Sequence, residues 1–272
     1  MNLFFRQMTW KRGPHATERS YVNPAVIVYG MVSVLAGTGM ATAQAGAQAL
    51  DHRTFDQLLR THVDTEGRVN YSALQGEAGL LDSYIQSLAT VDLNAMSKPE
   101  QLATMINAYN AFTLRLILDH YPIQSIMNIP EGKRWKHERW RFAGKMWSLD
   151  ALEHQGIRKQ FKEPRIHFAL VCAAVGCPKL RHEAYAGDRL EEQLEDQSRY
   201  VHTHDTWFRY KAGAQTVYLT KLYEWYGSDF DHLGGPIAFA SRYSKALAET
   251  LKKGNPKIAW LDYDWALNDK RE

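Results

Sequence analysis

The segment SKPEQLATMINAYNAFTLRLILDHYP, residues 97–122, decides the fold. The hydroxyl of Ser97 can cap the first turn of a helix while Glu100 reaches back to it, an arrangement called a capping box. Pro122 disfavours helical geometry in the residue before it, so the segment predicts a helix from Lys98 to about His120. The apolar residues of this helix cover nearly its whole circumference, which is typical of a central helix.

Shorter patterns on both sides of this helix predict a helix-rich α+β class. Helical periodicity occurs at residues 51–62, 80–88, 150–161, 188–201 and 236–251. Extended patterns occur at residues 140–149 and 207–219 as hairpins, at 165–172 as an interior strand, and at 258–265. No linker-like composition interrupts the chain after residue 50. The sequence therefore predicts a single globular domain over residues 50–272, with a small, mainly antiparallel sheet.

The first 45 residues have the order of a secretory signal peptide. Basic residues precede an uncharged run whose apolar part, Ala25 to Ala36, is shorter than the roughly 20 residues of a membrane span. Small-x-small triplets around Ala43 then offer sites for signal peptidase. We expect residues 1–45 to pack against nothing and the mature protein to be periplasmic or secreted. An uncleaved leader would instead anchor the protein in a membrane.

The formal net charge of +3 belongs to this leader, because the rest of the chain carries equal numbers of acidic and basic residues. A neutral domain lacks the basic surface that phosphate backbones require, so nucleic acid is not expected as a partner. One local exception is the segment from Lys133 to Lys145, where six basic residues surround Trp135 and Trp140 against Glu138 alone. This segment either contacts an anionic envelope surface or is a solvated hairpin with its aromatic residues packed on one face.

Several short motifs follow one another in a fixed order along the chain. They are INAYNA (106–111), LEH (152–154), PRIHFAL (164–170), GCP (176–178), LYEWYG (222–227) and YDW (263–265). From about Phe55 onward, the chain resembles the domain of unknown function 547 family in these motifs and in their order. The resemblance implies a thiol site that pairs the His segment with the Gly-Cys-Pro segment.

Cys172 and Cys177 are the two cysteines of the chain. A helical turn beginning after Cys177 would put Pro178 at its first position and lower the pKa of the Cys177 thiol. The alternatives are a disulfide between the two cysteines or a pair of inert thiols. Cys172 is the poorer partner for His167, because a strand over residues 165–172 would separate the two by about 16 Å on opposite faces.

His167 lies between apolar neighbours, and Glu153 lies on the apolar stripe of its helix. Buried polar groups of this kind need partners. One interpretation is a relay in which Cys177 is the nucleophile, His167 the base and Glu153 the group that orients the base. The other is structural: a hydrogen-bonded core histidine, and a carboxylate paired with Arg165 or a buried amide.

Asn107, Asn110 and Arg165 are the candidate substrate-binding residues. The two asparagines can hold a substrate amide or an oxyanion from a rigid helix, or they can bind neighbouring backbone instead. His202 and His204 could form half of a metal site, but nothing fixes a third ligand. We therefore expect a solvated histidine pair, with neither a metal site nor a cofactor.

These observations favour an exported thiol-dependent hydrolase or acyl transferase that acts on a peptide, amide or ester bond of an unidentified small-molecule or peptide substrate. The rival is a non-catalytic envelope binding module with a Cys172–Cys177 disulfide. The state of the two thiols distinguishes the two hypotheses.

Overall fold

The computed structural model describes residues 50–270. The predicted signal peptide, including the segment from Ala25 to Ala36, lies outside the described residues. Over residues 50–270, none of the helices is both long enough and apolar enough to cross a bilayer.

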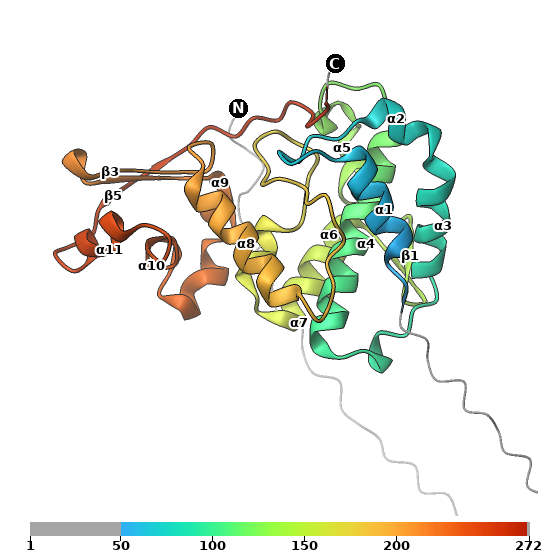
Figure 1. Cartoon of the computed structure of the whole chain (residues 1–272), viewed down its shortest axis with the longest axis horizontal. Helices are drawn as coiled ribbons and strands as arrows, with labels where there is room; N and C mark the ends of the chain where they lie inside the picture. The colour runs from blue at the N-terminus through green and yellow to red at the C-terminus, as the bar shows by residue number, and fades with distance from the viewer. Residues whose placement is uncertain (1–49, 271–272) are drawn as a thin grey trace, which may run out of the picture. The chain divides into compact units, whose positions relative to one another are not determined.

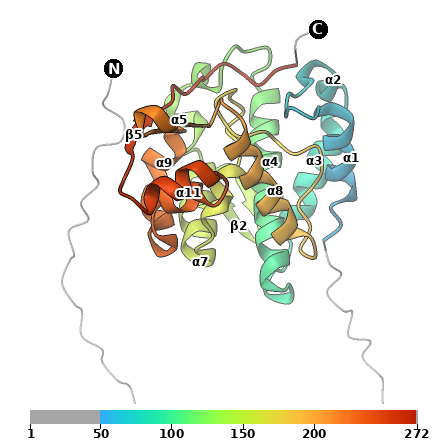
Figure 2. The same ribbon diagram turned by 60° about the vertical axis from the view of Figure 1, so that its left-hand side comes forward.

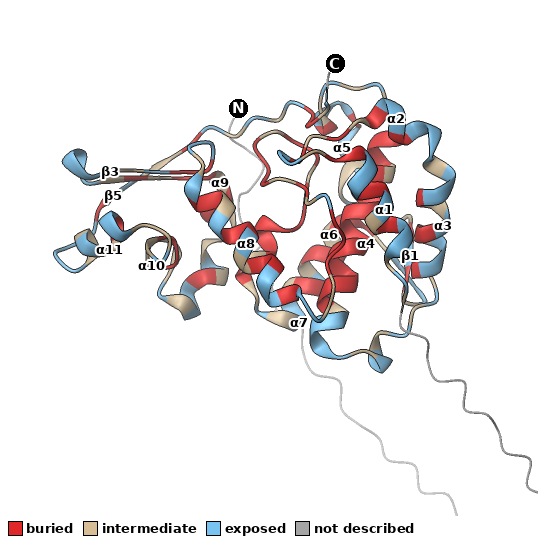
Figure 3. Cartoon of the chain, in the orientation of Figure 1, coloured by how far each residue is buried: buried red, intermediate tan, exposed pale blue. Residues whose placement is uncertain are grey.

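Helix α4 (Lys98–Leu118) forms the centre of the first of two hydrophobic clusters. The predicted capping box begins it, because Ser97 accepts from the Glu100 N–H and the Glu100 carboxylate accepts from the Ser97 N–H at 2.8 Å. Sixteen of the 21 residues of α4 are buried. Figure 3 shows them in red along much of the helix. The prediction of a central helix is confirmed.

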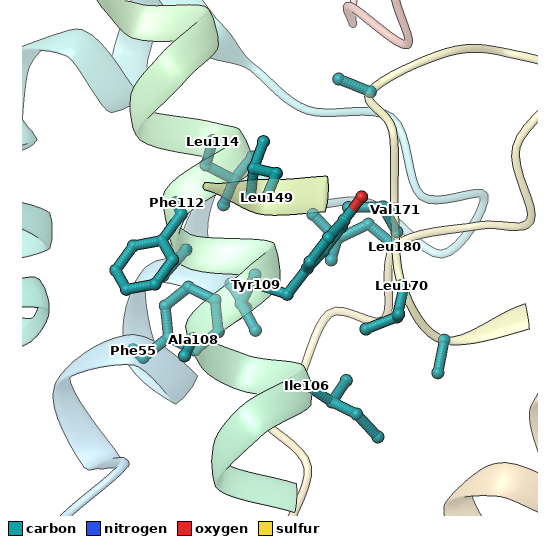
Figure 4. Close-up of a cluster of buried hydrophobic side chains, with 14 of the residues drawn as sticks. Phe55, Ile106, Ala108, Tyr109, Phe112, Leu114, Leu149, Leu170, Val171 and Leu180 are labelled. Carbon is teal, nitrogen blue, oxygen red and sulfur yellow. The ribbon is translucent and has the colours of Figure 1, made fainter. Parts of the chain in front are cut away.

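Short helices and a two-stranded hairpin pack around α4 (Figures 1 and 2). They are α1 (Arg53–His62), α2 (Tyr71–Gly76), α3 (Ala78–Leu88), and the antiparallel strands β1 (Trp140–Phe142) and β2 (Lys145–Trp147). Figure 4 shows Phe55 and Phe112 on one side of α4, and Tyr109 on the side where Leu170 and Val171 lie. The face of α4 that carries Tyr109 therefore meets the segment around residue 170.

The basic segment from Lys133 to Lys145 spans the end of α5 (Glu131–Arg134) and most of this hairpin. Trp140 points inward and stacks on Phe112 with ring centroids 4.8 Å apart. Aromatic packing on one face is what the solvated-hairpin interpretation requires. Contact with an anionic envelope surface stays a prediction.

The second cluster surrounds a three-stranded sheet in the C-terminal part of the chain, orange to red in Figure 1. Its elements are α8 (Leu190–Thr203), β3 (Phe208–Lys211), β4 (Thr216–Leu219), α9 (Lys221–Tyr226), α10 (Pro236–Ser241), α11 (Lys245–Leu251) and β5 (Lys257–Trp260). Strands β3 and β4 form the predicted hairpin, and β5 pairs with β4 in parallel. The helix-rich α+β class is confirmed.

The predicted strand at residues 165–172 is wrong. Residues Pro164–Phe168 form a 3-10 helix, η4. Pro164 suits the first helical position, and the Glu163 carboxylate caps the turn by accepting the Arg165 N–H at 3.0 Å. These local interactions outweigh the apolar pattern that favoured a strand.

The helical turn considered after Cys177 is absent, because residues 178–189 form turns and irregular backbone. One helix prediction is also wrong. The single helix expected over residues 236–251 is instead α10 followed by α11, because Ser244 caps α11 by accepting the Leu247 N–H at 3.4 Å.

His202 anchors α8 in the second cluster and is not the solvated residue that the sequence suggested. Its Nδ1 lies 2.6 Å from the Ser198 carbonyl and its Nε2 lies 2.7 Å from the Tyr223 hydroxyl. Only 3% of the residue is exposed. Burial lowers the pKa of His202 from 6.5 to about 4.

We predict that the free energy of unfolding decreases as the pH is lowered from about 6.5 to about 4. In this range the His202 side chain binds a proton in the unfolded chain but not in the folded protein. The contribution is on the order of 3 kcal/mol, from a shift of roughly two to three pKa units. His202→Gln should flatten this slope in urea unfolding curves measured across the range, whereas His204→Gln should not. An unchanged slope in His202→Gln would contradict the assignment.

Candidate functional site

His167 is buried on η4, which spans the boundary between the two hydrophobic clusters. Ile166 belongs to the first cluster and Phe168 to the second. The Nε2 of His167 donates to the Asp229 carboxylate at 2.8 Å, and its ring stacks on Tyr226 with centroids 3.9 Å apart. Burial lowers the pKa of His167, although the hydrogen bond to Asp229 opposes this. His167 is therefore held neutral and in one orientation.

Asp229 is the orienting carboxylate that sequence reasoning missed. It lies in the 3-10 segment Gly227–Leu233 and also accepts two hydrogen bonds of 2.7 Å from Arg158. Burial would raise the pKa of Asp229, but the hydrogen bonds from His167 and Arg158 outweigh it and bring the pKa well below its usual value. The pair of Asp229 and Arg158 thus fixes His167 without adding net charge.

Glu153 lies on a π-helix, η3 (Leu152–Arg158), which continues α6 (Leu149–Ala151) into α7 (Lys159–Phe161). π-helical turns are rare and are frequent at functional sites. Glu153 is 9% exposed, and its carboxylate accepts from the Tyr109 hydroxyl at 3.3 Å. The Tyr226 hydroxyl hydrogen-bonds it as well, and burial together with this carboxylate raises the pKa of Tyr226.

The predicted relay is not assembled as expected. In the described residues, Glu153 makes no hydrogen bond to His167, and His167 makes none to either sulfur. Arg165 does not pair with Glu153 either, because its guanidinium is held by Glu163 and Glu191 at 2.7 Å each. Arg165 is thus committed to the protein itself, and nothing in its contacts points to substrate.

Cys172 is the thiol that the structure activates. Its Sγ lies 2.9 Å from the Tyr263 hydroxyl. The polar contact with Cys177 is the largest influence on the Cys172 thiol and lowers its pKa. The contacts with Tyr263 and Ala174 act in the same direction, and together they outweigh burial and the nearby Glu153 carboxylate.

Cys177 has the opposite character. Its hydrogen bond to Cys172 and its burial both raise its pKa well above the usual value. Its sulfur accepts the Cys172 N–H at 3.2 Å, and its thiol donates to the Leu170 carbonyl at 3.7 Å. The expectation of a lowered Cys177 pKa is therefore wrong, because the helix that would have lowered it is absent from residues 178–189. Both cysteines are free thiols, and they are not at disulfide distance.

The chain folds back between the two cysteines. Ala173 is buried with a left-handed φ of 59°, a strained backbone conformation for a residue with a Cβ atom. Gly176 then packs so closely on the 263–265 segment that an added Cβ would lie 2.7 Å from the Asp264 nitrogen. The Trp207 indole donates to the Gly176 carbonyl at 2.9 Å. This loop brings the sulfur atoms of Cys172 and Cys177 close to each other.

Asn107 and Asn110 bind backbone rather than facing an open site. Asn110 donates to the Ala169 carbonyl and accepts the Val171 N–H, both at 3.0 Å. Asn107 makes the same two-sided contact with the backbone of Tyr185, at 2.8 and 2.9 Å. The carboxamide oxygen and nitrogen of each asparagine are thus engaged within the protein. Asn110 clamps the two peptide groups just before Cys172.

An open hollow of about 620 Å³ lies beside the thiol loop. It is lined by Asp64, Arg68, Val175, Asp264, Ala266, Leu267, Asp269 and Lys270. None of these residues is a cysteine, a histidine or a glutamate, so the hollow does not contain the candidate site residues. We therefore locate the candidate site at Cys172, Glu153 and His167, on the basis of their hydrogen bonds and charges.

Residues 93–200 match the family model described as Protein of unknown function, DUF547. This segment is similar to that family. The DUF547 segment contains every site residue predicted from the sequence, whereas Asp229 and Tyr263 follow it. No curated protein and no solved structure matches the chain. The part of the site contributed by α9 and the 263–265 segment therefore lies outside the DUF547 match.

We predict that Asn110→Leu and Asn107→Leu each destabilise the fold by about 2–4 kcal/mol, because each leaves a buried peptide N–H and carbonyl without partners. Chemical denaturation measures this loss. Only Asn110→Leu should also change the rate at which iodoacetamide labels Cys172 in the folded protein, since Asn110 alone holds the adjoining backbone. Equal labelling in the two variants would show that the clamp does not position the thiol.

Proposed function

We propose that this protein is a thiol-dependent hydrolase or acyl transferase in which Cys172 is the nucleophile. The observation that carries the proposal is the Tyr263 hydroxyl, which lies 2.9 Å from the Cys172 sulfur, and the contacts with Cys177, Tyr263 and Ala174 lower the pKa of this thiol. Donors to a sulfur atom stabilise the thiolate, which is the reactive form of cysteine. Cys177, proposed as the nucleophile from the sequence, becomes a positioning residue whose sulfur accepts the Cys172 N–H.

Glu153 is the group that we assign to proton transfer. Its charge is near enough to oppose ionisation of Cys172, and the hydroxyls of Tyr109 and Tyr226 hold its carboxylate. The Asp229–His167 pair acts on Glu153 indirectly. The His167 ring stacks on Tyr226, and Tyr226 holds the carboxylate. In this assignment His167 positions the Tyr226–Glu153 pair and does not take the proton from the thiol directly.

The proposed reaction has two steps. Glu153 takes the proton of the Cys172 thiol, and the resulting thiolate attacks the carbonyl carbon of an ester, thioester or amide. A C–S bond forms, and the bond to the leaving group breaks as that group takes this proton from Glu153. Water or another acceptor then attacks the thioester and gives its proton to Glu153, the bond to sulfur breaks, and the released Cys172 thiolate takes this proton back. Hydrolysis and acyl transfer differ only in this acceptor.

Two features of the chain bear on the choice between the two sequence hypotheses. Both cysteines are free, which weighs against the rival module stabilised by a disulfide. The predicted leader supports an exported location for the activity, with the substrate in the envelope or outside the cell.

We predict that iodoacetamide labels Cys172 below pH 8.5, the ordinary thiol value, and leaves Cys177 unlabelled. Cys177→Ala removes the contact that lowers the pKa of Cys172 most, so labelling of Cys172 at pH 7 should slow by roughly tenfold, the effect of about one pKa unit. Cys177→Ser keeps a polar hydrogen at this position and should restore most of the rate. Peptide mapping by mass spectrometry measures both, and preferential labelling of Cys177 would refute the assignment.

Glu153→Gln should have two opposite effects. Loss of the negative charge should lower the pKa of Cys172 and speed its labelling at neutral pH, whereas loss of the proton acceptor should slow turnover of p-nitrophenyl acetate at least tenfold. A purely structural role for Glu153 would move both rates in one direction. Glu224→Gln, a change on the exposed side of α9, is the matched control and should alter neither rate.

A further inference from the structure

Three aromatic residues form a half-exposed surface that begins at the reactive thiol. We call Trp225, Tyr263 and Trp265 the aromatic triad. The ring of Tyr263 lies 4.9 Å from that of Trp225 and 4.7 Å from that of Trp265, centroid to centroid. All three residues are partly exposed. The triad adjoins the nucleophile directly, because the Tyr263 hydroxyl is 2.9 Å from the Cys172 sulfur.

The end of α9 joins this triad to the proton-transfer group. Trp225 packs on Tyr263, whereas the next residue, Tyr226, stacks on His167 and hydrogen-bonds Glu153. Successive helical residues point about 100° apart, so one turn of helix reaches both halves of the site. A substrate carbonyl placed between Cys172 and Glu153 would therefore leave one of its substituents beside the triad.

The charges around the site select against an anionic substituent. Glu153 is a buried carboxylate, and the guanidinium of Arg158 is already bound by Asp229 in two hydrogen bonds of 2.7 Å. An anion would meet repulsion without a free counter-charge from these groups. A planar uncharged group would gain from ring stacking instead.

We propose that the site takes substrates in which one substituent of the carbonyl group is uncharged and aromatic, and that Trp225 and Trp265 hold this substituent beside Tyr263. The inference rests on the proposed function, since it assumes that Cys172 is the nucleophile. It makes Trp225 and Trp265 specificity-determining residues that lie outside the DUF547 match.

The test compares three reagents that alkylate Cys172 by the same step, in which the thiolate forms a C–S bond and chloride leaves. They are 2-chloroacetamide, its N-benzyl derivative and its N-(4-carboxybenzyl) derivative. In the full chain, the benzyl reagent should react about tenfold faster than 2-chloroacetamide after correction for their rates with free cysteine, as expected for one stacked ring. The carboxylated reagent should show no such advantage.

Trp225→Ala and Trp265→Ala should each reduce the benzyl-to-parent ratio to near one, and Trp225→Phe should retain most of it because a ring remains. Trp260→Ala, at a partly exposed tryptophan of β5, is the matched control and should keep the full ratio. The benzyl-to-parent ratio of rates corrects for any general change in the reactivity of the Cys172 thiol. A benzyl advantage that survives in both alanine variants, or an equal advantage for the carboxylated reagent, would overturn the inference.

The labelling ratio needs no turnover, so the two proposals can fail separately. Turnover of p-nitrophenyl acetate by Cys172 without a benzyl preference would remove the aromatic specificity and leave the thiol enzyme. A benzyl preference that depends on the triad, in a protein that turns over neither aromatic nor aliphatic esters or thioesters, would remove the proposed enzyme and leave an aromatic binding surface.

Discussion

The two hydrogen bonds that Asn110 makes with the backbone of residues 169 and 171 connect the core of the protein to its reactive segment. Asn110 is fixed because α4 is buried on nearly all sides, and a buried carboxamide has no water to replace a lost partner. The segment after η4 must therefore follow a path that satisfies Asn110. Cys172 follows immediately, and the left-handed turn at Ala173 is accommodated because the residues on both sides of it are held.

Most ionisable groups of this site are paired with one another, so few of them can change their charge. Arg158 and Asp229 neutralise each other, and His167 stays uncharged between Asp229 and Tyr226. The thiol of Cys172 is the group whose ionisation is both favoured and opposed. Burial and the Glu153 charge disfavour the thiolate, while the contacts with Cys177, Tyr263 and Ala174 favour it. A balance of this kind makes reactivity sensitive to any substrate that displaces water or engages one donor.

The sequence predicts the central helix, both hairpins and the α+β class because each depends on neighbouring residues, such as the capping box of Ser97 and Glu100. It fails at residues 164–172, where an apolar run resembles a strand but Glu163 and Pro164 begin a 3-10 helix. This error removed Cys172 from consideration, since the expected strand set it far from His167. His167 and Glu153 could be identified as buried polar residues from their apolar surroundings alone. Their partners Asp229 and Tyr226 could not, because sequences more than 50 residues away carry no local signal of contact.

The position of the site at the boundary between the two hydrophobic clusters explains why its residues come from such distant parts of the chain. Tyr263 packs against both clusters, and η4 contributes Ile166 to one and Phe168 to the other. Where two cores meet, polar side chains can be shielded from water on several sides without a continuous apolar layer covering them, and ligand sites are common at such junctions. Cys172 and Trp265 pack against the first cluster, and Trp225 and Tyr226 pack against the second. Chemistry at Cys172 therefore depends on the packing of both clusters, which ties the reactivity of the thiol to the integrity of the C-terminal part of the chain that lies beyond the DUF547 match.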